Sequence, residues 1–193
     1  MNQKYKWWIL GGVSILVLAT LTSFVLIRRS KNKKKNSDPT KNIIIGDSQT
    51  PFIAKNTTKA TILNKTGSEE SLWKGGMGLT WLKKAVLKYK KSPDINSVII
   101  NIGTNGGFNV NEDIEGLVDA IKEKFPNAKL YAVQGSWGWG GNKDKTLAGV
   151  KKYYKKFEDN DVELIEPPIG KVSDPHSNLP VYAEIGKAID NEL

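Results

Sequence analysis

The sequence contains no cysteine and a single histidine among its 193 residues. The absence of cysteine excludes disulfide bonds, thiol nucleophiles, iron–sulfur clusters, cysteine-based zinc sites and an acylated lipoprotein cysteine. A single histidine excludes metal centres built from several histidines, so any histidine-dependent chemistry must use His176. With about 150 residues as a working domain size, the length indicates one globular domain and an additional segment.

Acidic residues are almost absent from the first 38 positions. The chain has 29 basic and 20 acidic residues, a formal charge of +9. Eight of the basic residues but only one acidic residue, Asp38, lie in 1–38, which gives that segment +7 and leaves +2 for 39–193. The excess positive charge is local, and it does not indicate a nucleic-acid-binding domain.

Residues 7–27 (WWILGGVSILVLATLTSFVLI) contain no charged side chain. The stretch has 21 residues, enough to cross a hydrocarbon core of about 30 Å as a helix. It is longer than the apolar part of a cleaved signal peptide and lacks a good small-residue cleavage site. We therefore predict an uncleaved transmembrane helix in the lipid bilayer, preceded by a short flank over residues 1–6.

Residues 28–40 are polar, largely basic and without hydrophobic periodicity. This composition predicts a flexible tether close to anionic lipid headgroups, with a nucleic-acid arm as the less favoured alternative. The positive flank favours a cytoplasmic or virion-interior side for the globular domain. A function directed at the cell envelope favours the opposite side of the membrane, so the sequence leaves the topology open. It also leaves open whether the source is cellular or viral.

Beyond residue 40, short β-branched runs alternate with longer amphipathic stretches. The runs predict strands over 42–46, 60–63, 97–102, 129–134 and 162–165. The amphipathic stretches predict helices over 79–90, 111–124, 143–157 and 179–191. This alternation predicts an α/β domain over residues 41–193, with a mostly parallel five-stranded sheet between two helical layers. Ligand sites in such sheets lie at the carboxyl ends of the strands.

Polar and glycine-rich segments fall at those strand ends or just before helices. Ser48 follows the first strand in Gly-Asp-Ser, a position that suits a nucleophile, although Asp and Ser are also ordinary helix caps. Asn105 follows the strand over 97–102 and could donate to an oxyanion, as could a backbone N–H in the glycine-rich turn around Gly78. The simpler alternative is that both segments are only turns that connect strands and helices, with no role in catalysis. His176 lies in a polar loop beside Asp174, whose carboxylate could orient the ring.

Together these segments, IIIGDSQT, GGMGLTWL, IINIGTNGG and SDPHSN, resemble in order and approximate spacing the conserved blocks of the SGNH hydrolases, also called GDSL-type esterases and lipases. The resemblance implies a flavodoxin-like three-layer α/β/α fold, with Ser48 as nucleophile, His176 as general base and Asp174 as its partner. It also implies an oxyanion hole formed by the Ser48 and Gly78 backbone N–H groups and the Asn105 side chain. No metal or organic cofactor is required.

Two positions depart from the family pattern. Gly106 follows Asn105 where the family has Asp in Gly-x-Asn-Asp, and Asp174 and His176 are separated by one residue where the family has two. The second change alters the approach of the carboxylate to the imidazole. His176 therefore works with Asp174, with a backbone carbonyl or with water.

Trp137 and Trp139 follow the strand over 129–134, so we expect both beside the same edge. Their rings suit a sugar substrate, and packing under the loop is the alternative. The favoured hypothesis is a membrane-anchored serine esterase that removes acyl groups, most simply acetyl, from an envelope glycan or lipid. A catalytically idle SGNH-fold module that binds a glycan or a partner is the second. The third is an anchored module, such as a virion membrane protein, whose tether holds nucleic acid or anionic lipid.

Overall fold

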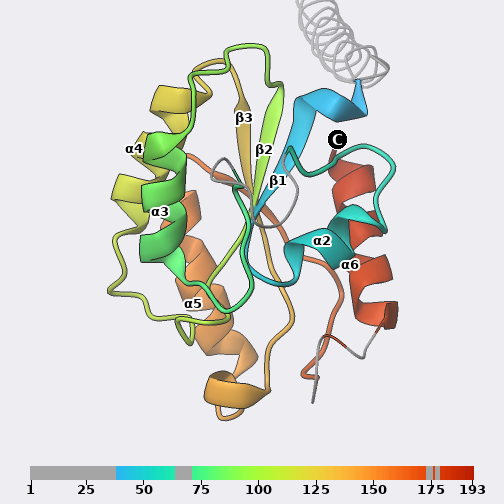
Figure 1. Ribbon diagram of the computed structural model, residues 1–193. Helices are drawn as coiled ribbons and strands as arrows, with labels where there is room; N and C mark the ends of the chain where they lie inside the picture. Colours follow the sequence, from blue (N-terminus) through green and yellow to red (C-terminus); the bar gives the residue numbers. More distant parts are fainter. Residues whose placement is uncertain (1–37, 64–70, 173–175, 177–178) are drawn as a thin grey trace, which may run out of the picture. The chain divides into compact units, whose positions relative to one another are not determined.

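The computed structural model describes residues 38–63, 71–172, 176 and 179–193 (Figure 1). The predicted transmembrane helix over 7–27 and most of the predicted tether lie outside the described residues, as does Asp174. No helix in the described part of the chain is long and apolar enough to cross a bilayer.

Four parallel strands form one sheet in the order β1-β2-β3-β4. Each strand is short, and all four follow the predicted ranges to within one residue: β1 is Asn42–Gly46, β2 is Ser97–Asn101, β3 is Lys129–Val133 and β4 is Glu163–Ile165. The register pairs Ile44 with Ile99 and Ile99 with Tyr131. The predicted α/β class with a parallel sheet is confirmed.

The prediction of a fifth strand over 60–63 was wrong. Within that stretch, Thr61 forms an isolated parallel bridge with Ile43, and a second isolated bridge joins Gly46 to Trp73. Around the second bridge, the Gly46 N–H donates to the Leu72 carbonyl at 2.9 Å. The outer edge of β1 therefore pairs with two short segments, one at Thr61 and one at Trp73. Each pairs with β1 at a single position, which is too little to form a strand.

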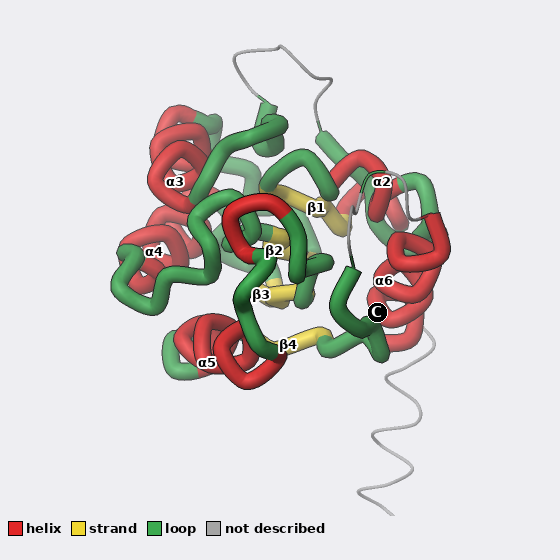
Figure 2. Tube along the Cα trace, turned by 90° about the horizontal axis from the view of Figure 1, so that it is seen from below, coloured by secondary structure: helices red, strands yellow, loops and turns green. Residues whose placement is uncertain are grey.

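The helices cover the two faces of the sheet in separate groups (Figures 1 and 2). The helices α3 (Leu79–Lys88), α4 (Ile114–Lys124) and α5 (Leu147–Glu158) lie on one face. The other face carries α2 (Thr50–Ala54) and α6 (Leu179–Glu192).

Successive strand residues point to opposite faces, and this alternation builds two hydrophobic clusters. Ile43 and Ile45 belong to the cluster beneath α3, α4 and α5, whereas Ile44 belongs to the cluster beneath α2 and α6. Because both faces are buried, each strand is apolar at consecutive positions. The result is the predicted three-layer α/β/α arrangement.

Side-chain caps decide where two helices begin. The Asp113 carboxylate accepts a hydrogen bond from the Gly116 N–H at 3.0 Å, and Thr146 Oγ1 accepts one from the Gly149 N–H at 3.2 Å. These caps start α4 and α5 a few residues later than the hydrophobic pattern predicted. The short helix α2, with Pro51 in its first turn, was not predicted. It begins two residues after Ser48 and sets the direction in which the chain leaves β1.

Candidate active site

The turn after β1 depends on a close approach between two strands. Gly46 has φ of +150°, and a Cβ added there would lie 1.8 Å from the Asn101 carbonyl oxygen at the end of β2. The Asp47 N–H donates to the same oxygen at 3.1 Å. Only glycine allows this approach. The turn places Ser48, which is half-buried, at the carboxyl edge of the sheet, the edge that faces the viewer in Figure 2.

Asp47 is a buried carboxyl group at this turn, 1% exposed. Its Oδ1 accepts a hydrogen bond from the Gln49 N–H at 3.0 Å, while Oδ2 has no hydrogen-bond partner among the described residues. Burial raises the pKa of Asp47 to about 7, and the Gln49 hydrogen bond opposes that rise. Near neutral pH the Asp47 carboxyl is therefore only partly ionised, so it contributes less than a full negative charge to the site.

Gln49 connects the three loops that follow β1, β2 and β3. Its side chain is fully buried; Nε2 donates to Thr104 Oγ1 at 2.8 Å, and Oε1 accepts from the Ser136 N–H at 2.8 Å and the Ser136 hydroxyl at 2.9 Å. A buried network in which each polar group has partners fixes its members rigidly. The residue after Ser48 is therefore anchored from two other loops.

Asn142 extends this network toward the loop between β3 and α5. Its Nδ2 donates to the Thr104 carbonyl at 3.0 Å. Its Oδ1 accepts from the backbone N–H groups of Gly138 at 2.8 Å and Trp139 at 3.2 Å. The position of Trp139 is thus tied to the loop that carries Asn105.

The turn over residues 75–78 lies against both Ser48 and the Asn105 loop. A Cβ added to Gly75 would lie 3.8 Å from Ser48 Cβ, and one added to Gly78 would lie 4.0 Å from the Gly106 N atom. Asn105 is exposed, and its Nδ2 donates to the Met77 carbonyl at 3.0 Å. This bond uses one of the two hydrogens on Nδ2. The structure therefore gathers the three predicted oxyanion-hole residues around one turn.

His176 is exposed, and aromatic rings contact it from two elements. Its ring centroid lies 5.6 Å from that of Phe52 and 5.8 Å from that of Trp139, both edge to face. Phe52 is in α2, one helical turn beyond Ser48. His176 is thus held at the same edge of the sheet as Ser48, while its predicted partner Asp174 lies outside the described residues.

The two tryptophans have different environments. Trp137 is 6% exposed and packs in the hydrophobic cluster beneath α3, α4 and α5. Trp139 is half-buried and lies beside His176. Of the pair, Trp139 is the one whose ring lies beside His176.

Sequence reasoning missed Glu112, an acid close to the predicted oxyanion hole. The Glu112 carboxyl is 3.9 Å from a Cβ placed on Gly78, and Oε2 accepts a hydrogen bond from the Tyr153 hydroxyl at 3.3 Å. Burial raises the pKa of Glu112, and the Tyr153 hydrogen bond opposes the rise. No local pattern identifies such a residue, because it precedes a helix in sequence and meets the site only in the folded chain. For Asp47 and Gln49 a signal exists, since both are polar residues directly after a buried strand.

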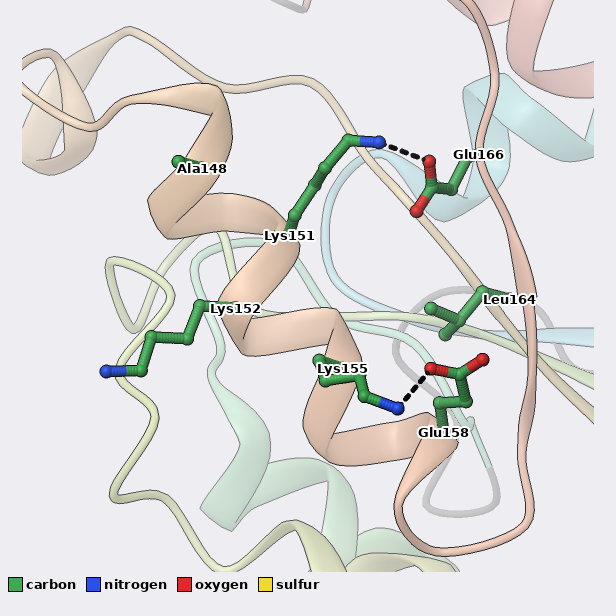
Figure 3. A pocket seen from close by; sticks show the side chains of 7 residues that line it. All are labelled: Ala148, Lys151, Lys152, Lys155, Glu158, Leu164 and Glu166. Carbon is green, nitrogen blue, oxygen red and sulfur yellow. Dashed lines mark hydrogen bonds and ion pairs between the residues drawn. The ribbon is translucent and has the colours of Figure 1, made fainter.

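A hollow on the outer surface of α5 and β4 contains none of the predicted site residues (Figure 3). Lys151 and Lys155 line it, and each is paired with a carboxylate, Glu166 and Glu158 respectively, at 2.6 Å. We assign this hollow no part in catalysis. In the part of the chain that the structure describes, no three His, Asp or Glu side chains are grouped so as to hold a metal ion.

The sheet, its two helical layers and the tight turn at Ser48 define the three-layer α/β/α fold of the SGNH, or G-D-S-L, lipolytic proteins. No protein-family model and no curated protein matches the sequence. Three solved structures with TM-scores of at least 0.50 illustrate the likeness.

A candidate platelet activating factor from Streptococcus pneumonia has a TM-score of 0.58 at 13% identity, over 92% of this chain and 98% of that one. A protein assigned to the lipolytic G-D-S-L family of Desulfitobacterium hafniense has a TM-score of 0.54 at 10% identity, over 78% of this chain and 98% of that one. The OSK domain of Drosophila Oskar has a TM-score of 0.50 at 14% identity, over 78% and 86%. At such identities the likeness establishes the fold.

Proposed function

We propose that this protein is a serine ester hydrolase. Ser48 attacks an ester carbonyl while His176 accepts the hydroxyl proton, and the alcohol leaves as an acyl-enzyme forms on Ser48. Water then releases the acid. The developing oxyanion is held by the Ser48 and Gly78 N–H groups and by the Asn105 amide. The main support is that the turn over 75–78 passes close to Ser48 and accepts a hydrogen bond from the Asn105 amide.

The substrate we favour is an acylated, most simply acetylated, envelope glycan. Trp139 is half-buried and its ring lies beside His176, where an aromatic ring would offer a large, flat apolar surface to a sugar. A lipid ester is the alternative. A Trp139→Ala variant that raises KM for a glycan ester but leaves p-nitrophenyl acetate unaffected would support the glycan.

We further propose that residues 7–27 anchor the enzyme in a bilayer and that the basic tether lies near anionic headgroups. The support is the uncharged run in the sequence and the local +7 charge. Full-length protein should stay with membranes after extraction at alkaline pH, whereas a variant lacking 1–36 should be released. Release of the full-length protein would contradict the anchor, and protease access in sealed vesicles would assign the side of the domain.

The activity is tested with the full-length protein in detergent, using p-nitrophenyl acetate and an acetylated glycan. Ser48→Ala and His176→Ala should each lower kcat/KM by at least about 10³-fold. Thr80→Ala, which removes an exposed hydroxyl in the first turn of α3, is the matched control and should retain activity. A fluorophosphonate probe should label wild type at Ser48.

The second candidate is a non-catalytic glycan-binding module, favoured by the single residue between Asp174 and His176. In that case wild type would neither hydrolyse these esters nor react with the fluorophosphonate. Glycan binding would then be unchanged in Ser48→Ala and weakened in Trp139→Ala. Such a result would replace the hydrolase proposal.

A further inference from the structure

The Glu112 carboxyl occupies the space in which a side chain at position 106 would lie. A Cβ added to Gly106 would be 2.7 Å from Glu112 Oε1 and 3.1 Å from both Cδ and Oε2. Gly106 is not among the residues with positive φ, so its backbone does not require glycine. A side chain at 106 would therefore require the Glu112 carboxyl to move from its present position.

Position 106 directly follows Asn105, and it is the place where the SGNH pattern has an acidic residue. In this chain a carboxyl group reaches the same place from another segment, the turn before α4. The glycine at position 106 is read from the sequence, and the closeness of the Glu112 carboxyl is read from the structure, so the two observations are independent. Both concern the space next to the Gly106 Cα atom.

Glu112 is held from the core side. The Tyr153 hydroxyl donates to Oε2 at 3.3 Å, and the Tyr153 ring is fully buried against Phe108, with ring centroids 5.7 Å apart. The neighbouring Asp113 caps α4 and forms an ion pair with Lys83 of α3 at 2.6 Å. The segment that carries Glu112 is thus attached to α3, α4 and α5, and its carboxyl lies against Gly78 and Gly106.

We propose that Glu112 is a positioning residue for the oxyanion hole, supplying from the turn before α4 the carboxyl group that the SGNH pattern has at position 106. It supports the two loops that carry the Gly78 N–H and the Asn105 amide and keeps the spacing between these donors. This inference rests on the proposed hydrolase function. Glu112 does not contact the reacting atoms, so it acts through the donors it supports.

The decisive test moves the carboxyl from one segment to the other. Glu112→Ala should lower kcat by about 10- to 100-fold with little change in KM, since small displacements of catalytic groups cost rates of this order. The double variant Gly106→Asp with Glu112→Ala should recover kcat to within about threefold of wild type. Gly106→Ala with Glu112→Ala fills space without an acceptor for Tyr153 and should not recover.

Two further variants separate positioning from packing. Glu112→Gln keeps the shape and one acceptor for Tyr153, so it should lose less kcat than Glu112→Ala. Gly106→Asp alone places two side chains in one volume and should lose both kcat and thermal stability. An unchanged kcat in Glu112→Ala, or equal failure of the Asp and Ala double variants, would overturn the proposal.

Melting temperature distinguishes failure of this inference from failure of the proposed function. A wild type that neither hydrolyses esters nor reacts with the fluorophosphonate refutes the hydrolase, and the role of the Glu112 carboxyl is then tested by stability alone. The exchange of carboxyl groups is still measurable in that case. The exchange is supported if Gly106→Asp, but not Gly106→Ala, restores the melting temperature of Glu112→Ala. If neither restores it, the exchange is overturned.

Discussion

The side-chain oxygen of Gln49 accepts two hydrogen bonds from Ser136, one from its backbone N–H at 2.8 Å and one from its hydroxyl at 2.9 Å. Gln49 follows the proposed nucleophile, and Ser136 lies in the loop after β3. All the groups involved are buried, so water cannot replace a missing partner. The position of the Ser48 turn is therefore decided in part by a segment distant in sequence.

Replacement of Gln49 tests this relationship. Gln49→Leu leaves the Ser136 N–H and hydroxyl buried without their acceptor, and we expect a loss of about 2–4 kcal/mol in the free energy of unfolding. Urea denaturation measures it. Asn127→Ala, which removes an exposed amide hydrogen bond to the Pro93 carbonyl, should cost less than about 1 kcal/mol. Equal losses in the two variants would contradict a special role for the buried network.

Asp47 should make stability depend on pH. Its pKa in the folded state is about 7, against an ordinary value of 3.8, because burial disfavours the charged form. The folded state therefore binds the proton more tightly, so this contribution to stability is complete below about pH 4 and is lost as pH rises to about 7. The total is roughly 4 kcal/mol.

Melting curves from about pH 4 to about pH 8 measure this effect, and Asp47→Asn should flatten them and stabilise the protein at the upper end. The same carboxyl-to-amide change at exposed Asp94 controls for the loss of one charge. Matching curves for Asp47→Asn and wild type would show that Asp47 does not carry the pH dependence.

Gly46→Ala should be severely destabilising. Its Cβ would lie 1.8 Å from the Asn101 carbonyl oxygen, a distance that the two strands can relieve only by moving apart. We expect a loss of about 3 kcal/mol or more in urea denaturation, or failure to fold. At Gly170 an added Cβ has no atom within 4 Å, so Gly170→Ala is the control and should change stability little. A near-native Gly46→Ala protein would show that the turn is less constrained than the structure indicates.

Asn105→Ala tests the oxyanion hole. Loss of one donor costs about 10²- to 10³-fold in kcat, and because the side chain is exposed the melting temperature should change little. Asn109→Ala removes another exposed amide from the same loop region and should retain kcat. Steady-state kinetics with p-nitrophenyl acetate measure both, and an unaltered kcat in Asn105→Ala would exclude that side chain as a donor.

The amino-acid sequence by itself determined the class of fold and placed the candidate active site at the carboxyl edge of the sheet. β-branched runs such as NIIIG and SVIIN, separated by amphipathic stretches, are stable only as strands buried on both faces, so a parallel sheet between helices follows. The carboxyl ends of parallel strands share one edge, so Ser48 and Asn105 were expected to lie near each other. The likeness to G-D-S-L proteins agrees with that prediction of the fold.

Only the tertiary structure decided features that depend on contacts between distant segments. The outer edge of β1 is shared by Thr61 and Trp73, so the predicted fifth strand did not form. Trp137 is buried while Trp139 lies beside His176, although the two residues share one local motif. Glu112 fills the space next to Gly106. Hydrophobic periodicity reports which face of an element is buried, but it carries no information on which distant side chain will occupy a given volume.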